Sequence, residues 1–283
     1  MHLEAFLHSA QPLLEERLHA LIPSDTQLPF GGLFAAARYS LFSGGKRLRP
    51  LLVLASCLTV EGTLQKALDP ACAIECIHTY SLIHDDLPCM DNDDMRRGKP
   101  TLHCVYPEWH ALLTGDYLLT FAFEILAQSP YLSDAEKIAC IQLIAANCGA
   151  RGMIGGQMID LHTESMQIDK ALLEQMHSAK TAALFSAALE CGAIAAGASP
   201  RERSLLRECG EKIGLAFQIA DDIFDAPSSD QKNNKATAVS LLGYAEAMRC
   251  KEALLNESLS ILNSLSQSTF LLSSFFEKIL KTS

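Results

Sequence analysis

The first residues suited to chemistry form a run of carboxylates, "HDDLPCMDNDD", residues 84–94. An apolar run with helical spacing precedes it, and Pro88 interrupts that helix directly after Asp85 and Asp86. Asp91 follows on the turn. Negative charge at the C-terminal end of a helix opposes the helix dipole and needs compensation. Hard cations such as Mg²⁺, which prefer oxygen ligands, would supply it.

A second acidic run, "FQIADDIFDAP", has the same character. Asp221 and Asp225 are four residues apart, so on a helix both carboxylates point the same way. Gln218 and Asp222 flank that face, and Pro227 ends the helix. A single such cluster could be a solvated charge run. Two clusters that each end an apolar helix favour metal binding.

A basic stretch, "GGKRLRP", complements the carboxylates. It sets Lys46, Arg47 and Arg49 on a glycine-rich loop whose backbone can approach an anion closely, and Pro50 suits the first turn of the next helix. Arg contacts phosphate in a bidentate manner, whereas Lys acts as a point charge. The sequence matches neither a Walker A loop nor a dinucleotide fingerprint. These residues predict a diphosphate held by carboxylate-bound Mg²⁺ on one side and by Lys and Arg on the other.

Composition restricts the class of protein. The chain has 283 residues with no Gly/Ser-rich or Pro-rich linker, 49% hydrophobic residues and a net charge of -10, which argues against nucleic acid as a partner. Its ten cysteines include no CxxC pair, and Cys72 and Cys76 lack a second pair that would complete a zinc site. We therefore expect reduced, mostly buried thiols.

The start of the chain lacks the basic region and the apolar core of a secretory signal. No apolar run reaches the roughly 18 residues of a membrane span without polar interruption. We expect a cytoplasmic protein with no integral membrane association.

The elements that position these residues are helices. Apolar patterns of helical spacing recur along the chain, whereas alternating strand patterns are almost absent. The helical patterns cover residues 2–21, 31–42, 51–60, 67–87, 108–128, 134–162, 169–196 and 201–226, with two more beyond 238. They predict an all-α bundle with long central helices.

The order of these motifs closely resembles the trans-isoprenyl diphosphate synthases, most of all the bacterial farnesyl diphosphate synthases. The matching stretches run from about residue 30 to 245: "GGKRLRP", "ECIHTYSLIHDDLPCMDNDDMRRGKPT", "LTGDYL", "GGQMIDL", "KTAAL" and "GLAFQIADDIFD". The resemblance implies one polyprenyl synthetase domain over residues 1–283. About ten or more helices would surround a central cavity, with the two aspartate motifs facing each other across its mouth.

The resemblance also assigns roles. The implied catalytic residues are Asp85, Asp86, Asp91, Arg96, Lys180, Thr181, Gln218, Asp221, Asp222 and Lys235. The implied metal ligands are Asp85, Asp91, Asp221 and Asp225. Arg96, Lys180 and Lys235 would neutralise the allylic diphosphate, and Thr181 and Gln218 would stabilise the developing cation. Lys46, Arg49, His78 and Arg97 would hold isopentenyl diphosphate without metal.

The implied reaction is head-to-tail condensation of isopentenyl diphosphate with dimethylallyl or geranyl diphosphate, which gives farnesyl diphosphate and diphosphate. The resemblance implies Mg²⁺ as cofactor, about three ions per active site, with Mn²⁺ as a substitute. The allylic C–O bond breaks to a carbocation, the isopentenyl double bond attacks it, and the released diphosphate takes the proton. The family resemblance also implies a homodimer.

Product length should depend on the residues that form the bottom of the cavity. Tyr80 and Ser81 precede Asp85 by five and four residues, about 6 to 7.5 Å along a helix. A ring there, with the two extra residues in "DDLPCMD", resembles the farnesyl-producing bacterial type. Tyr117 would narrow the cavity further. Ordinary core packing of Tyr80 is the alternative, and a geranylgeranyl product then becomes possible.

One departure from the family follows the second motif. The loop before "NNKAT" is about ten residues short and lacks the lysine that relatives carry, because Lys232 belongs to the "NNK" element. We therefore expect an active enzyme with a high requirement for allylic substrate. Three alternatives stay open: a weakly active or noncatalytic synthase subunit, a terpene cyclase, and a helical Ca²⁺-binding or interaction protein.

Overall fold

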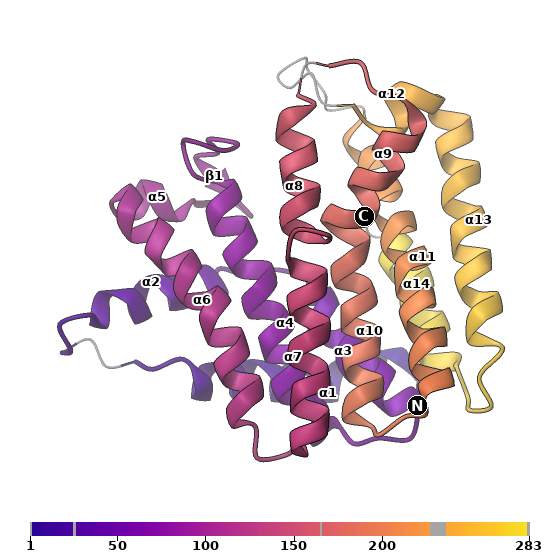
Figure 1. The fold of residues 1–283 in the computed structure, drawn as a ribbon, viewed down its shortest axis with the longest axis horizontal. Coiled ribbons are helices and arrows are strands. Elements are labelled where there is room, and N and C mark those ends of the chain that lie inside the picture. Colours follow the sequence, from indigo (N-terminus) through magenta and orange to yellow (C-terminus); the bar gives the residue numbers. More distant parts are fainter. Residues whose placement is uncertain (1, 25–26, 165, 227–235, 282–283) are drawn as a thin grey trace.

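The structure is a computed structural model that describes residues 2–24, 27–164, 166–226 and 236–281. Helices dominate these ranges, which confirms the predicted all-α fold (Figure 1). The helices are α1 (Leu3–Leu21), α2 (Gly31–Leu41), α3 (Leu48–Thr59), α4 (Leu64–Asp85), α5 (Leu102–Val105), α6 (Glu108–Gln128), α7 (Asp134–Cys148), α8 (Met153–His162), α9 (Lys170–His177), the π-helical turn η1 (Ser178–Ala182), α10 (Ala183–Ala195), α11 (Pro200–Asp225), α12 (Ala238–Leu242), α13 (Tyr244–Leu262) and α14 (Phe270–Lys281). Two short antiparallel strands, β1 (Met95–Arg96) and β2 (Lys99–Pro100), pair Met95 with Pro100.

Helix α10 lies at the centre of the bundle and is buried along its whole length. Its sequence, "ALFSAALECGAIA", is apolar or small on nearly every face, as expected of a fully enclosed helix. A Cβ atom on Gly192 would lie 2.2 Å from the carbonyl oxygen of Val53, so only glycine allows α10 to approach α3 this closely. Helices α3, α4 and α11 pack around α10 (Figure 1).

The two longest helices of this core carry the aspartate motifs. Helix α11 begins with a capping box, in which Ser199 and Glu202 satisfy each other's backbone N–H groups, and with Pro200 in its first turn. It ends at Asp225, and α4 ends at Asp85. Both helices run towards the same end of the bundle (Figure 1). The fold therefore brings the two motifs to one end.

Three predicted segments differ in detail. The predicted helix over 134–162 is two helices, because the backbone turns near Gly152. The turn brings this backbone so close to Asn147 that a Cβ atom on Gly152 would lie 1.8 Å from the Asn147 carbonyl oxygen. The segment 169–196 is interrupted by η1, and three helices, not two, lie within the described residues 236–281. By length and composition alone the stretch Asp134–His162 could cross a membrane, but the break at 149–152 divides it between α7 and α8.

Candidate active site

The first aspartate motif folds back on the end of α4. The backbone N–H of Asp91 donates to the carbonyl oxygen of Asp85 at 2.9 Å, which closes the turn. Burial raises the pKa of the Asp85 carboxyl to about 6, although the positive charge of Lys180 opposes the shift. Asp86 is buried and accepts a hydrogen bond from Arg96 Nε at 2.6 Å. The two carboxyls therefore differ. The charge of Asp85 is only partly compensated by its neighbours, whereas Asp86 is paired with Arg96.

The second motif shows the same division. Burial raises the pKa of Asp221 to about 6, and the neighbouring charge of Asp225 adds to this shift. Asp222 is buried and fixed from two sides, because its carboxylate accepts from Gln218 Nε2 at 3.0 Å and from the backbone N–H of Ala238 at 2.7 Å. Asp221 is therefore the member of the pair available for a ligand, and Asp222 ties α12 to the motif.

The π-helical turn η1 lies next to both motifs and holds two of the predicted residues. The Thr181 hydroxyl donates to Gln218 Oε1 at 2.6 Å, and Lys180 Nζ donates to Asp160 Oδ2 at 2.6 Å. A single π turn inside a helix often marks a functional site. Sequence reasoning gave Asp160 no role. Its signal was present in "GGQMIDL", where the glycine at 156 lets the backbone of Lys180 approach.

The basic loop faces α11. Gly44 and Gly45 have φ of 103° and 125°, a conformation that side-chain-bearing residues rarely adopt. Arg97 donates from Nη1 to the carbonyl oxygen of Gly44 at 2.6 Å, with its guanidinium against Gly45. The turn after the first motif therefore joins the "GGKRLRP" loop.

Arg49 extends from the first turn of α3, and its side chain is partly buried. Its guanidinium lies 4.8 Å from the centroid of the Phe185 ring, and burial lowers its pKa to about 10. Arg49 Nε is buried and has no hydrogen-bond partner among the described residues. Burial also lowers the pKa of His78, with Arg49 and Arg97 adding to the shift, so this imidazole is neutral.

These groups surround a cavity of about 370 Å³. The predicted site residues that line it are Lys46, Arg49, His78, Arg96, Arg97, Thr181, Gln218 and Asp221. Asp86 lines a smaller adjacent pocket together with Arg96 and Arg97. Lys235 and the shortened loop over 227–235 lie outside the described residues.

One basic residue differs from expectation. The sequence placed Arg47 with Lys46 and Arg49 on an anion-binding loop, but its guanidinium is buried and occupied by other partners. Arg47 donates to Glu75 at 2.5 Å, to Glu15 at 2.7 Å and to the carbonyl oxygen of Leu41 at 2.5 Å. Arg47 and Glu75 line the cavity, but because Glu75 and Glu15 compensate its charge, Arg47 supports the fold.

Tyr80 is buried on α4, about one and a half turns before Asp85. Its ring meets His84 edge-on at 5.7 Å between centroids, and its hydroxyl has no hydrogen-bond partner in the described part of the chain. His84 is itself fixed at α6, because Nε2 lies 3.0 Å from the carbonyl oxygen of Leu112. Ser81 donates its hydroxyl to the carbonyl oxygen of His78 at 2.9 Å.

On α6, Tyr117 belongs to a second aromatic group. Its ring stacks on Phe121 at 5.2 Å and lies 5.7 Å from Phe34 of α2. Aromatic side chains of α2 and α6 therefore pack together, and both helices contact α4, which carries Tyr80.

Comparison with known proteins identifies the family. The polyprenyl synthetase family model matches residues 32–268. A geranylgeranyl diphosphate synthase of Cyanophora paradoxa is 41% identical over 270 residues, covering 91% of this chain and 89% of the relative. The chloroplastic geranylgeranyl pyrophosphate synthase 7 of Arabidopsis thaliana is 47% identical over 73% of this chain, which matches 60% of that longer protein.

Two solved structures have the same fold. An FPP/GFPP synthase from Zymomonas mobilis superposes with a TM-score of 0.89 at 38% identity and covers 99% of this chain and 98% of its own. A geranyltransferase of Helicobacter pylori, solved with magnesium and isoprenyl diphosphate, gives 0.85 at 35% identity and covers 98% and 96%. The chain therefore belongs to the polyprenyl synthetase family, the trans-isoprenyl diphosphate synthases, and is a prenyltransferase.

Proposed function

We propose that this prenyltransferase condenses isopentenyl diphosphate with dimethylallyl and then geranyl diphosphate to give farnesyl diphosphate and diphosphate. The observation that carries the proposal is the cation-lined cavity that is bordered by Asp221 of the second motif and by Arg96 and Arg97 after the first motif. It contains a buried guanidinium nitrogen, Arg49 Nε, with no partner among the described residues. A buried donor of this kind needs an acceptor, and a diphosphate oxygen supplies one.

The carboxylates fit Mg²⁺. Asp85 and Asp221 both have pKa values raised to about 6, so in the ionised form each carries charge that its protein neighbours do not fully compensate. Asp91 and Asp225 complete the two groups of ligands, about three ions in all, and Mn²⁺ is expected to substitute. When bound, the ions supply Lewis-acid stabilisation of the leaving diphosphate. Asp86 and Asp222, held by Arg96 and by Ala238, maintain the shape of the two groups.

The remaining residues act on the allylic substrate. Lys180 is near enough to Asp85 to oppose its pKa shift, and Arg96 is bonded to Asp86, so both place positive charge beside the proposed leaving group. Electrostatic stabilisation of the leaving diphosphate lowers the barrier to C–O cleavage. Gln218 Oε1, oriented by the Thr181 hydroxyl, presents a dipole to the carbocation. Lys235 is proposed as a further cation from the family motif alone.

Isopentenyl diphosphate binds on the other side of the cavity. Lys46, Arg49 and Arg97 converge there from the loop, α3 and the turn after the first motif. Burial lowers the pKa of His78, so this imidazole is proposed to bind by hydrogen bonding. Leu82 and Phe217 also line the cavity and would limit the access of water to the cation.

Product length is proposed from these aromatic residues. The buried Tyr80 ring lies on α4 about one and a half turns before Asp85, and Tyr117 and Phe121 lie on α6, which packs against α4. A growing chain that meets these rings stops early, which favours farnesyl over longer products. Ser81 belongs to the same floor. A geranylgeranyl product is the second candidate, because the Cyanophora paradoxa relative carries that name.

Product sizing tests both candidates. Purified full-length protein is incubated with isopentenyl diphosphate, Mg²⁺ and dimethylallyl, geranyl or farnesyl diphosphate in turn. A dominant farnesyl product supports the proposal, whereas extension of farnesyl diphosphate to geranylgeranyl diphosphate overturns it. Steady-state kinetics with geranyl diphosphate tests the separate proposal about the short loop, which an ordinary micromolar Michaelis constant would contradict.

Three broader assignments accompany the reaction. Residues 1–283 form one polyprenyl synthetase domain, the location is cytoplasmic, and the assembly is a homodimer. The dimer has support on α6, where Trp109, Leu112 and Leu113 expose 64%, 45% and 50% of their surface to solvent. Apolar side chains gathered on one helix are typical of a protein interface. Light scattering coupled to size exclusion gives the mass directly, and a monomer at micromolar concentration would contradict the homodimer.

A further inference from the structure

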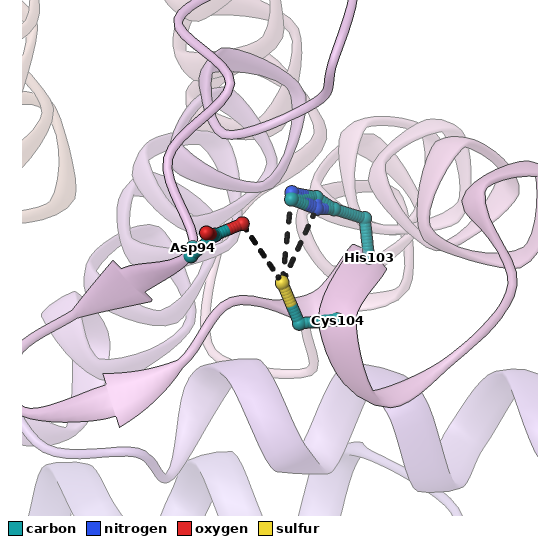
Figure 2. Close-up of side chains that lie close together, drawn as sticks. All are labelled: Asp94, His103 and Cys104. Atoms are coloured by element: carbon teal, nitrogen blue, oxygen red, sulfur yellow. Dashed lines mark hydrogen bonds between the residues drawn. The ribbon is translucent and has the colours of Figure 1, made fainter.

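Asp94, His103 and Cys104 converge just outside the first aspartate motif (Figure 2). Asp94 precedes β1, whereas His103 and Cys104 lie on α5, so the β1–β2 hairpin folds the two segments together. One potential ligand atom from each residue lies within 4.8 Å of the other two. The group offers an oxygen, an imidazole nitrogen and a sulfur.

The distances from the sulfur approach those of a tetrahedral transition-metal site. Cys104 Sγ lies 3.5 Å from Asp94 Oδ1 and 3.8 Å from either ring nitrogen of His103. Metal–ligand bonds of about 2.0 to 2.3 Å at tetrahedral angles place neighbouring ligand atoms about 3.5 to 3.6 Å apart. Two of the three distances are therefore close to those around one ion, and rotation of the side chains about their χ angles would align an imidazole nitrogen with it.

A buried hydroxyl orients the imidazole. Thr101 is buried, and its Oγ1 donates to the carbonyl oxygen of Asp93 at 2.7 Å. Its lone pairs can then accept from His103 Nε2, which lies 3.5 Å away. When Nε2–H is directed towards Thr101, Nδ1 is the nitrogen left to bind a metal, an arrangement typical of metal-bound histidine.

We propose that Asp94, His103 and Cys104 form a binding site for a divalent transition cation of the zinc class, separate from the Mg²⁺ ligands. The sulfur and nitrogen ligands select this class over Mg²⁺, which prefers oxygen. On binding, the Cys104 S–H bond breaks, its proton passes to solvent, and the thiolate sulfur bonds to the metal. Asp94 and Cys104 are exposed, so a water can take the fourth position.

A cation bound at this site would restrain the turn after the first aspartate motif. Asp94 and Cys104 are the two ends of a segment that contains Arg96 and Arg97, both of which line the cavity. An ion shared by the two ends closes this segment into a ring and limits its motion. The metal therefore sets the stiffness of the turn that carries two of the cavity's cations.

Cobalt titration tests the site. Co²⁺ is added to reduced, full-length protein in excess Mg²⁺, and the near-ultraviolet charge-transfer band that reports a thiolate–cobalt bond is followed. We expect one Co²⁺ per chain, displaced by Zn²⁺. Cys104→Ser should abolish the band. His103→Gln should weaken affinity by more than about tenfold, since loss even of a group that only orients a ligand costs 10- to 100-fold.

Two matched controls locate the cation. Cys89→Ser removes another exposed thiol near the first motif, and Asp85→Asn alters the proposed Mg²⁺ site. Both variants should keep the band and its affinity. A wild-type protein without the band, a band that survives Cys104→Ser, or a band lost in Cys89→Ser or Asp85→Asn would overturn the proposal. Circular dichroism of each variant verifies that the fold is intact.

Discussion

Replacing Arg47 with methionine should destabilise the fold. The side chains of Arg47 and Glu75 are 3% and 2% exposed, so the variant leaves the Glu75 carboxylate buried without its cation. Removing one partner of a buried ion pair costs about 3 to 5 kcal/mol. Glu15, which also bonds Arg47, is 33% exposed and keeps partial hydration, so it adds little.

The expected change in melting temperature depends on chain length. At about 2.1 cal/mol/K per residue, the 283 residues give an unfolding entropy of ~0.6 kcal/mol/K. A loss of about 3 to 5 kcal/mol therefore lowers the melting temperature by roughly 5 to 8 °C. Thermal unfolding followed by circular dichroism at fixed protein concentration measures this shift.

Two controls separate stability from substrate contact. Lys46 is exposed on the same loop, so Lys46→Met should change the melting temperature by less than about 1 °C while it weakens isopentenyl diphosphate binding. The double variant Arg47→Met with Glu75→Leu removes both charges and should recover most of the lost stability. If Arg47→Met shifted the midpoint by less than about 2 °C, or the double variant were as unstable as the single one, the buried-pair reasoning would be refuted.

Three further predictions concern the site itself. Asp85→Ala should reduce turnover by about two orders of magnitude or more with an unchanged melting profile, and full activity in a coupled diphosphate assay would remove its metal role. Tyr80→Ala should lengthen the main product, while Tyr80→Phe, which keeps the ring, should not; chromatography of dephosphorylated products distinguishes them. In metal-free protein the pKa values of Asp85 and Asp221 are about 6 in the folded state against 3.8 in the unfolded state. Between pH 3.8 and about 6 the folded state therefore binds more protons than the unfolded state, and the free energy of unfolding falls as the pH rises through this range. Mg²⁺ needs the ionised carboxylates, so its stabilising effect in thermal unfolding should be larger above about pH 7 than near pH 5, and an equal effect would contradict this.

The helices and their ends were predictable because their signals are local. Apolar spacing predicts both ends of α6, and α4 and α11 end within the acidic motifs at Asp85 and Asp225, two residues and one residue before the predicted ends. The break between α7 and α8 depends instead on a close backbone approach at Gly152, which the apolar pattern of 134–162 conceals. The π turn was also hidden, since its residues fit an uninterrupted helix.

Within the site, residue types were predictable but pairings were not. Sequence spacing could not reveal that Arg47 lies against Glu75 and Glu15, more than twenty residues away in each direction along the chain. The same limit applies to Asp160, whose carboxylate accepts from Lys180 across two helices. Long-range partners determine which charges are compensated and which remain for a ligand.

The π-helical turn also fixes a phase relation between α9 and α10. Its one-residue insertion rotates α10 by about 100° relative to its position in an uninterrupted α-helix. Leu173 and Met176 of α9 accordingly belong to one apolar cluster, with α12 and α13, and Leu184 and Phe185 of α10 belong to the main core. Deleting one residue within Ser178–Ala182 would rotate the apolar face of α10 away from the main core while that of α9 keeps its position. The π turn that carries Lys180 therefore also allows one continuous helical segment to pack into two separate apolar clusters.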